Sequence, residues 1–479
     1  MKQPLFAVLL LGLIALGGCA TNPATGESNF VMMSEQQELD LGLRASQEIG
    51  KENPRYADEK LQAYVQQVGE RVAQHSHRSN LKYQFTVVDS ADINAFALPG
   101  GYIYIHRGLL AYLGSEAELA AVLGHEVGHV TARHGVQQQS QSMAWGVLGQ
   151  AVAIGTGVGA AGDLTNVLGS AMVRGYGRDM ELQADGLGAQ YLARSGYDPQ
   201  AMIEVVKVLK SQEDFARDQA AQRGQPTPTS SYHGVFDTHP DNDRRLQEVV
   251  GPARALANGS AQQTNREVFL QHLDGLPVGD SEATGVRRGR HFYHAGLGFA
   301  LSFPEDWVVL NQPDVLVGQS AVQQAFIAMQ LERAEGTPEA FLRARLRGQG
   351  LAEAEALQQA GLQGYTGVIP GQAAKRVAVI FKGSQAFLFV AAVKGGASLE
   401  SADAQFLQTI KSFHPLAADE RKLAQPMRLQ MVRAKAGQTY AELAKNSPLP
   451  RDAEATLRLL NHQYPSGQPM PGKWLKLVH

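Results

Sequence analysis

The chain has 479 residues, enough for about three domains of ordinary size, and its 44% hydrophobic and 19% charged residues are typical of a globular protein with a sizeable core. Its formal net charge of −3 comes without a basic stripe or a long acidic run, which argues against nucleic acid as a partner and against a disordered acidic tail. The single cysteine, Cys19, cannot form an internal disulfide, so packing must stabilise the fold.

The N-terminus predicts a secretory signal peptide over residues 1–18. Lys2 provides a positive charge, and the apolar run from Leu5 to Leu16 is too short to span a bilayer comfortably. Two small residues then stand directly before Cys19, as they do at a signal cleavage site.

The position of the cysteine indicates a lipid anchor. Leu16-Gly17-Gly18-Cys19 resembles a bacterial lipobox, in which the cysteine is acylated and becomes the mature N-terminus. Ala20 follows it instead of aspartate, and by analogy with lipoprotein sorting this favours the outer membrane. We therefore expect lipidation of Cys19, a tether over residues 19–29, and a periplasmic location anchored to the outer membrane. A plain signal with a chance cysteine is the alternative.

A helical region and a small sheet follow. Apolar residues recur at spacings of three and four from Ser34 to Gln74, which predicts helices. Tyr83 to Val88 predicts a strand, and Asn94 to Leu98 and Tyr102 to His106 predict two more around a Pro-Gly-Gly turn. We expect a small antiparallel sheet. Residues 101–104 would either offer an edge to an extended peptide or form an internal strand with no free edge.

The next helix carries a metal-ligating motif. Ser115 caps a helix that we expect to run to about Gln139. It contains His125-Glu126-Val127-Gly128-His129, the pattern H-E-x-x-H, whose histidines lie one turn apart on one helix face and can reach one zinc ion. Glu126 lies beside them and can take a proton from a metal-bound water. His134 comes five residues after the second histidine and is expected to face elsewhere.

A catalytic zinc needs a third protein ligand. Residues 132 and 135 are Ala and Gly, so the pattern H-E-x-x-H-x-x-G-x-x-H fails and the metzincin class is excluded. Downstream, Glu181-Leu182-Gln183-Ala184-Asp185 places two carboxylates four residues apart on one helical face. Such a pair is usually solvated surface. Beside H-E-x-x-H, we predict that Glu181 binds the metal and that Asp185 holds a histidine ring by its second nitrogen.

Between the two motifs, residues 143–162 form an apolar, glycine-rich stretch. Its length alone would suit a transmembrane helix. A single crossing would put His129 and Glu181 on opposite sides of a bilayer, where they could not share an ion. We therefore expect a flexible lid or helical hairpin that can touch a membrane surface.

The rest of the chain predicts further units. The first unit ends near residue 257 and is followed by a polar linker over residues 258–290. Residues 291–416 predict an α+β accessory domain with an antiparallel sheet. Its expected strands are Phe299–Phe303, Ala325–Leu331, Arg376–Phe381 and Ala386–Val393, and its expected helices are Pro338–Gly348 and Ala402–Ser412.

A small C-terminal unit covers residues 427–479. Val432 to Ala444 and Met470 to Lys476 resemble a LysM-type module, which binds peptidoglycan. The middle of the segment is irregular for that module, so a wall-binding role and a merely structural cap both stay open.

Four stretches, in this order, resemble the gluzincin metallopeptidase family of the HtpX and prenyl-protein endopeptidase type. The signal and lipobox make the branch of periplasmic, BepA-like lipoprotein proteases the nearest match. The resemblance covers about residues 30–255 and rests on Asn94 to Gly101, His125 to His129, Glu181 to Asp185, and Thr238-His239-Pro240 with Arg245.

The resemblance implies a fold, a cofactor and roles for single residues. It implies zinc bound by His125, His129 and Glu181, with Glu126 as general base and later proton donor. It places His239 and Arg245 near the site as stabilisers of the developing oxyanion. In related periplasmic members such a histidine can instead cap the zinc and silence it, and both roles are open for His239.

The expected architecture is therefore α+β: a mainly helical zincin-type peptidase domain over residues 30–257, then the accessory domain and the LysM-like module. The expected function is a zinc-dependent endopeptidase that cleaves misfolded or stalled cell-envelope proteins through a metal-activated water, as protein quality control. The alternative is a chaperone-like or peptidoglycan-tethered scaffold with a largely silent zinc site.

Overall fold

The computed structural model describes residues 19–143, 176–222, 224, 242–256, 262–312, 314–320, 324–394 and 397–479. The predicted signal peptide, nearly all of the predicted lid and His239 lie outside these residues. The chain divides into two compact units, of which the second comprises Pro277–Met427 and the first comprises the residues on either side of it. Both contain helices and sheets, so the predicted α+β class is confirmed.

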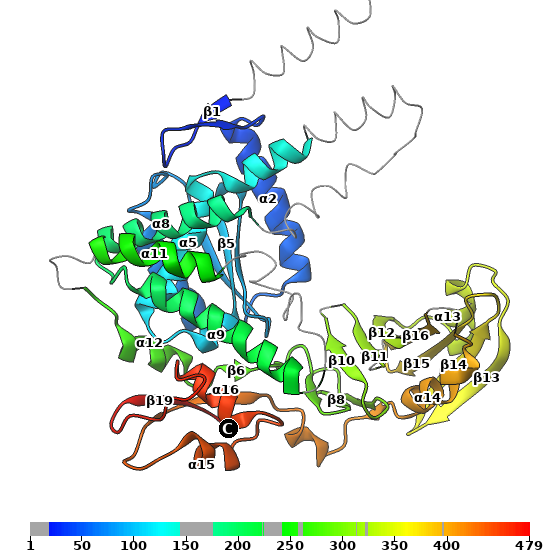
Figure 1. Cartoon of the computed structure of the whole chain (residues 1–479). Coiled ribbons are helices and arrows are strands. Elements are labelled where there is room, and N and C mark those ends of the chain that lie inside the picture. Colours follow the sequence, from blue (N-terminus) through cyan, green and yellow to red (C-terminus); the bar gives the residue numbers. More distant parts are fainter. Residues whose placement is uncertain are drawn as a thin grey trace, which may run out of the picture. The chain divides into compact units, whose positions relative to one another are not determined.

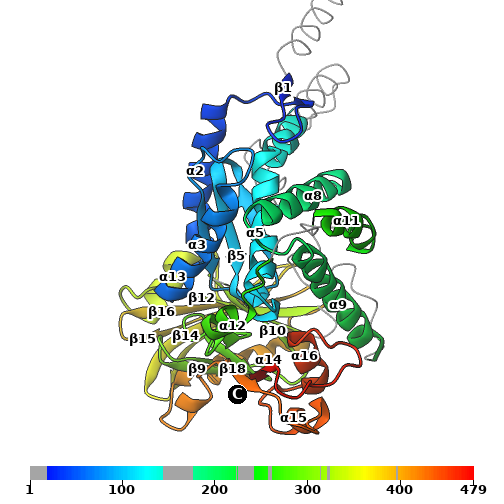
Figure 2. The same cartoon turned by 90° about the vertical axis from the view of Figure 1, so that its left-hand side faces the viewer.

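The first unit is mainly helical (Figures 1 and 2). Its helices are α2 (Glu35–Glu52), α3 (Glu59–Ala73), α4 (Arg107–Tyr112), α5 (Glu116–Thr131), α8 (Arg178–Arg194), α9 (Ala201–Gln222), α11 (Asn242–Leu256), α12 (Arg266–Leu273), α15 (Tyr440–Lys445) and α16 (Ala453–Leu460). Its strands are β1 (Cys19–Thr21), β2 (Ser28–Phe30), β3 (Gln84–Val88), β4 (Ala95–Leu98), β5 (Tyr102–His106), β18 (Met427–Arg433) and β19 (Trp474–Val478), and a 3₁₀ turn, η1 (Pro99–Gly101), joins β4 to β5.

The sheet next to the motif helix has the order β3-β5-β4. β4 pairs antiparallel with β5 through the turn η1, but β3 pairs parallel with β5. The prediction of an antiparallel sheet is therefore wrong for one of the two pairings. Of the two alternatives for residues 101–104, the structure shows the internal strand, since β5 is hydrogen-bonded on both sides.

The outer side of β3 is closed by side chains of α3. The amide of Gln62 accepts from the backbone N–H of Val87 and donates to its carbonyl, and Gln66 accepts from the N–H of Phe85. An unprotected strand edge invites pairing with another chain. Here two glutamines satisfy the backbone groups that a further strand would use.

Helix α5 is buried on every side, from Glu116 to Thr131. Ser115 caps it, as predicted, by accepting from the backbone N–H of Glu118. Its buried carboxylates have partners: Glu116 accepts from the hydroxyls of Tyr64 and Tyr197 at 2.6 and 2.8 Å. A helix buried all round must pair each of its polar side chains, and these two hydrogen bonds do so for Glu116.

The C-terminal residues 428–479, for which the sequence predicts a separate module, belong to the first unit. Lys476 is 1% exposed, and its ammonium group donates to the carbonyls of Ala111 and Leu113 at the end of α4. Burial lowers the pKa of this lysine to about 7. These contacts cap carbonyls that α4 leaves unsatisfied, and they tie the end of the chain to the helix that leads into α5.

The second unit is built on a seven-stranded antiparallel sheet with the order β10-β11-β12-β16-β15-β14-β13. Its strands are β6 (Pro277–Val278), β7 (Val286–Arg288), β8 (His291–His294), β9 (Phe299–Ser302), β10 (Val308–Asn311), β11 (Leu316–Gln319), β12 (Ala325–Arg333), β13 (Ala352–Gln359), β14 (Leu362–Ile369), β15 (Lys375–Lys382), β16 (Gln385–Val393) and β17 (His414–Pro415), and its helical segments are α13 (Pro338–Arg345), α14 (Glu400–Lys411) and η2 (Glu420–Lys422).

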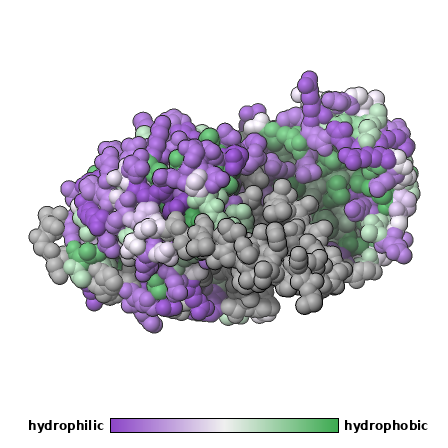
Figure 3. Space-filling view, turned by 90° about the horizontal axis from the view of Figure 1, so that it is seen from above, coloured by the Kyte–Doolittle hydropathy of each residue, from purple (hydrophilic) through white to green (hydrophobic). Residues whose placement is uncertain are grey.

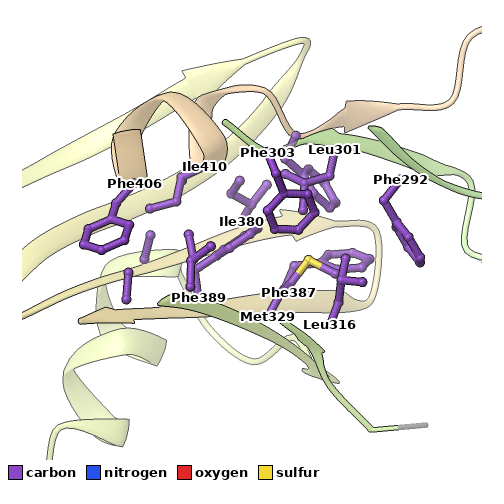
Figure 4. Close-up of a cluster of buried hydrophobic side chains, with 14 of the residues drawn as sticks. Phe292, Leu301, Phe303, Leu316, Met329, Ile380, Phe387, Phe389, Phe406 and Ile410 are labelled. Carbon is purple, nitrogen blue, oxygen red and sulfur yellow. The ribbon is translucent and has the colours of Figure 1, made fainter. Parts of the chain in front are cut away.

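This sheet has apolar side chains on both faces. Along β15, Val377 and Val379 join the cluster under α13, whereas Ala378 and Ile380 join the larger cluster that contains Phe406 of α14. Figure 4 shows the larger cluster, to which β16 contributes Phe387 and Phe389 and α14 contributes Phe406 and Ile410. The alternation follows from the period of two along a strand, and it explains the continuously apolar run that predicted this strand.

No helix among the described residues is both long enough and apolar enough to cross a membrane. Figure 3 shows one face of the molecule, on which most of the described surface is hydrophilic.

Candidate metal centre

Three ligand-type side chains from two helices meet in the first unit. His125 and His129 come from α5 and Glu181 comes from the first turn of α8, and all three are at most 5% exposed. The two histidine Nε2 atoms lie 2.9 Å apart, and each lies 3.4 Å from an oxygen of Glu181. Two atoms that each lie about 2 Å from a common tetrahedral ion are about 3.3 Å apart, so the spacing fits a small divalent cation.

The two helices approach closely because small residues face one another. Figure 1 shows α5, α8 and α11 side by side. A Cβ atom added to Gly128 would lie 3.0 Å from the carbonyl oxygen of Ala184, and one added to Gly188 would lie 3.0 Å from the backbone nitrogen of His125. Larger residues at these positions would push α8, and with it Glu181, away from the two imidazoles.

Asp185 lies one helical turn after Glu181 and contacts the outer nitrogen of His125. Its Oδ1 is 2.8 Å from the Nδ1 of His125, which is the contact that the sequence predicts for it. Arg245 from α11 donates to both oxygens of the same carboxylate, at 2.8 and 2.7 Å. Its guanidinium is also 3.6 Å from Glu181. These two hydrogen bonds hold Asp185, and a longer one, of 3.4 Å, joins Arg245 to the Oδ1 of Asn242 on the same helix.

Burial and pairing act in opposite directions on these groups. Burial alone would raise the pKa of Asp185, but the guanidinium of Arg245 outweighs it and lowers that pKa to about 2. Burial would lower the pKa of His125, but hydrogen bonds with Asp185 and Glu181 raise it to about 10. Asp185 is consequently an anion at any physiological pH, and it favours a proton on the Nδ1 of His125.

The motif helix ends earlier than predicted. Its last residue is Thr131, and Arg133 has a φ of 58°, in the left-handed region. Residues 134–143 then form a second helical run. The break turns His134 back toward the site, so its Nδ1 lies 2.8 Å from the Nδ1 of His129. The expectation that His134 faces elsewhere is therefore wrong, because it assumed an uninterrupted helix.

Two more residues near the site have no assigned role in the sequence prediction. Gln183 of α8 places its Oε1 2.7 Å from the Nε2 of His134. Tyr176 stacks on the ring of His129, with 3.9 Å between the ring centroids. The sequence signal for Gln183 is its place inside the E-x-x-x-D stretch, between the two carboxylates. No local signal distinguishes Tyr176.

A small cavity of about 30 Å³ reaches His125 and Glu126. Arg245 lies at its wall, and most of its other lining residues are apolar. This volume suffices for one water molecule. Glu126 itself is 2% exposed, so its carboxylate lies in a largely dry environment beside the cluster.

The structure places some of the site residues predicted from the sequence together and does not describe others. The structure brings together His125, Glu126, His129, Glu181, Asp185 and Arg245. His239 lies outside the described residues, as does the signal peptide whose cleavage would expose Cys19.

Comparisons with known proteins agree with this geometry. Residues 59–253 match the model of Peptidase family M48. The beta-barrel assembly-enhancing protease of Escherichia coli (strain K12) is 30% identical over 264 residues, which cover 53% of this chain and 52% of the relative. The mitochondrial metalloendopeptidase OMA1 of Arabidopsis thaliana is 31% identical over 196 residues, which cover 41% of this chain and 38% of the relative.

Among solved structures, the cyanobacterial PsbP protein CyanoP from Synechocystis sp. PCC 6803 has a TM-score of 0.22 and 15% identity. The match covers 27% of this chain and 95% of the CyanoP chain, and a TM-score this low says nothing about activity.

This chain spans about half (52%) of the length of the assembly-enhancing protease that it matches. The matched segment contains α5, α8 and the whole cluster of ligand-type side chains. Residues 59–253 therefore match a Peptidase family M48 domain, and the predicted resemblance to the gluzincin metallopeptidases is confirmed.

Proposed function

We propose that this protein is a zinc-dependent endopeptidase. The observation that carries the proposal is the convergence of His125, His129 and Glu181 within 3.4 Å of one another, with the carboxylate of Glu126 beside them. Two imidazoles and one carboxylate are a ligand set of catalytic zinc sites, which leave one position for water or substrate. The match to Peptidase family M48 supports the same assignment.

When bound, the cation would supply Lewis acidity, which polarises the scissile carbonyl and lowers the pKa of water toward neutrality. Glu126, directly after the first ligand, accepts the proton of the attacking water and returns it to the leaving amine. A carboxylate with few competing water contacts is suited to that exchange. The cavity beside Glu126 has room for the water.

We propose two roles for Arg245. Arg245 holds Asp185, and through it the ring of His125, by two hydrogen bonds. Its guanidinium also lies in the wall of the cavity, where it can oppose the negative charge that develops on the substrate carbonyl. For His239 we retain the two roles that the resemblance implies, an oxyanion donor or a cap on the zinc.

We further propose unfolded or misassembled cell-envelope proteins as substrates. The name of the assembly-enhancing protease and the lipobox at Cys19 support this location and this substrate class. Acyl chains on Cys19 would hold the enzyme at the outer membrane, facing the periplasm. The LysM-like pattern in residues 427–479 supports contact with peptidoglycan, with the structural cap on α4 as the alternative.

The proposal is tested with Glu126→Gln in the full chain. The substitution keeps the size of the side chain and removes the proton acceptor, so we expect the rate of cleavage of unfolded outer-membrane protein or casein to fall at least about 100-fold, with bound zinc unchanged. Glu118→Gln is the matched control, since it makes the same change on the same helix, two turns before the metal ligands. It should leave cleavage within a few-fold of the wild type.

Two results would contradict the proposal. Cleavage that persists in Glu126→Gln would assign the activity to another group. Absence of cleavage by the zinc-loaded wild type, together with normal function of Glu126→Gln in cells, would favour the scaffold with a silent site.

A further inference from the structure

His129 has its outer nitrogen directed at another histidine, whereas His125 has its outer nitrogen directed at a carboxylate. The Nδ1 of His129 is 2.8 Å from the Nδ1 of His134, and the Nε2 of His134 is 2.7 Å from the Oε1 of Gln183. The three side chains form a continuous hydrogen-bonded row that starts at the ligand cluster and ends on α8. His129 and His134 are 1% exposed, and Gln183 is half-buried.

The direction of the hydrogen bonds in this row follows from its end. The Oε1 of Gln183 is an acceptor, so the Nε2 of His134 carries a proton and donates it. The Nδ1 of the same neutral ring is then an acceptor, and it receives the proton on the Nδ1 of His129. The Nε2 of His129 is left with a lone pair, and it is this atom that lies 2.9 Å from the Nε2 of His125 and 3.4 Å from Glu181.

His134 is held in place by the break after α5. The left-handed φ of Arg133 is unusual for a residue with a side chain, and the guanidinium is fixed by Glu38 at 2.8 Å and by the carbonyl of Met33 at 3.2 Å. A conformation of this kind persists where surrounding contacts determine it. Here those contacts come from α2 and the residues before it, and their effect is to point His134 at His129.

We propose that His134 and Gln183 are positioning residues, which fix the tautomer and the ring orientation of His129 so that its Nε2 faces the metal. This inference rests on the proposed metal centre. It adds a second outer contact to the one between His125 and Asp185. Helix α8, which supplies the ligand Glu181, takes part in both, directly through Asp185 and through the contact of Gln183 with His134. One helix thus donates a metal ligand and orients both imidazoles.

The two outer contacts differ in charge. Asp185 is an anion, so it both orients His125 and makes that ring a stronger donor. The His134–Gln183 pair is neutral and orients His129 without adding negative charge to a site that already contains three buried carboxylates, Glu126, Glu181 and Asp185. The proposal therefore predicts that metal affinity depends on whether the side chain of residue 183 accepts or donates a hydrogen bond, and not only on its size.

The test measures the dissociation constant of Zn²⁺ from the full chain by competition with a fluorescent chelator, and the visible spectrum of the Co²⁺-loaded protein. We expect His134→Phe to raise the Zn²⁺ dissociation constant about 10- to 100-fold. Gln183→Ala should raise it by about 10-fold. Gln183→Lys, which can only donate, should raise it more than Gln183→Ala, whereas Gln183→Glu, which accepts, should leave it unchanged or lower it.

Two controls separate positioning from folding. His106→Phe removes another buried histidine of the first unit, which lies outside the ligand cluster, and should leave the Zn²⁺ dissociation constant within twofold of the wild type. Because residue 183 is half-buried, its Ala, Lys and Glu variants can be compared even if His134→Phe unfolds. Altered Co²⁺ absorption in His134→Phe or Gln183→Lys reports a change in ligand geometry that a loss of stability would not produce.

Equal Zn²⁺ affinity in the wild type, His134→Phe and Gln183→Lys would overturn the inference. It would also be overturned if Gln183→Glu bound Zn²⁺ more weakly than Gln183→Ala and Gln183→Lys. The failure of the proposed function looks different: in that case the wild type itself binds no Zn²⁺ or, once loaded, cleaves no protein. Wild-type binding and cleavage with unaffected variants would therefore refute only the positioning role.

Discussion

At the scale of single residues, the sequence predicted more of the ligand cluster than of what surrounds it. H-E-x-x-H and E-x-x-x-D have fixed spacings on helices, so His125, His129, Glu181 and Asp185 could be identified before their contacts were known. The position of His134 depends on the left-handed φ of Arg133, which is held by Glu38, 95 residues earlier in the chain. No pattern in the residues near His134 contains that information.

A second buried histidine gives the protein a dependence on pH. His106 is 5% exposed, and within the described part of the chain neither of its ring nitrogens has a hydrogen-bond partner. Burial, with a smaller contribution from Arg107, lowers the pKa of His106 to about 4 from an ordinary value of about 6.5. The unfolded chain therefore binds more protons than the folded chain between these values, and stability is lost as the pH falls through this window.

We predict that this group lowers the free energy of unfolding by about 2 kcal/mol between pH 7.5 and pH 5. His106→Phe removes the titration and keeps a ring against Phe96. Urea unfolding at the two pH values should show a smaller loss of stability in the variant than in the wild type, by about that amount. An identical loss in both proteins would mean that His106 is already protonated, or solvated, in the folded state.

At the scale of elements, α2 is fastened to the break after α5 by one carboxylate. Glu38 is 1% exposed and accepts from Arg78 at 2.6 Å and from Arg133 at 2.8 Å. Glu35, one turn earlier on the same helix, also pairs with Arg78, but its side chain is 60% exposed. Glu35 and Glu38 are thus the same residue type on the same helix with the same partner, Arg78, and they differ in how deeply the carboxylate is buried.

We predict that Glu38→Gln lowers the free energy of unfolding by about 3–5 kcal/mol, because Arg133 loses its carboxylate partner and the buried Arg78 keeps only the exposed Glu35. Glu35→Gln should lower it by less than about 1 kcal/mol, since water solvates an exposed pair. Chemical denaturation of the two variants checks this. Equal effects would show that the buried charges of Arg78 and Arg133 are compensated elsewhere.

Elements whose pattern conflicts with their environment were missed by the sequence prediction. Residues 352–359 are rich in alanine and glutamate, which favour helices, yet they form the outer strand β13. Ala352 to Ala356 are all exposed, so the alternation of alanine and glutamate in these residues does not mark a buried face, and only Leu357 is buried. Pairing with β14 overrides the local propensity. The inner strands β15 and β16 are buried or half-buried over most of their length, and both of them and β12 were predicted close to their observed bounds.

At the scale of the whole molecule, the order of units along the chain differs from their grouping in space. The sequence predicts three domains in succession, but the residues after Met427 pack with the first unit. The N–H of Leu429 donates to the carbonyl of Leu276, so the chain leaves the first unit and returns to it at neighbouring points. Contacts such as that of Lys476 with α4 join residues more than 360 positions apart, and no local periodicity reports them.

The measurement that tests the central proposal most directly is the metal content of the purified full chain, by elemental analysis after dialysis against a weak chelator. The proposal predicts about one zinc per chain in the wild type and in the exposed-surface control Glu248→Gln, and less than about a tenth of that in Glu181→Ala, which lacks the ligand from α8. A wild type without stoichiometric transition metal, or a Glu181→Ala variant that retains it fully, would contradict the assignment of His125, His129 and Glu181 as one metal site.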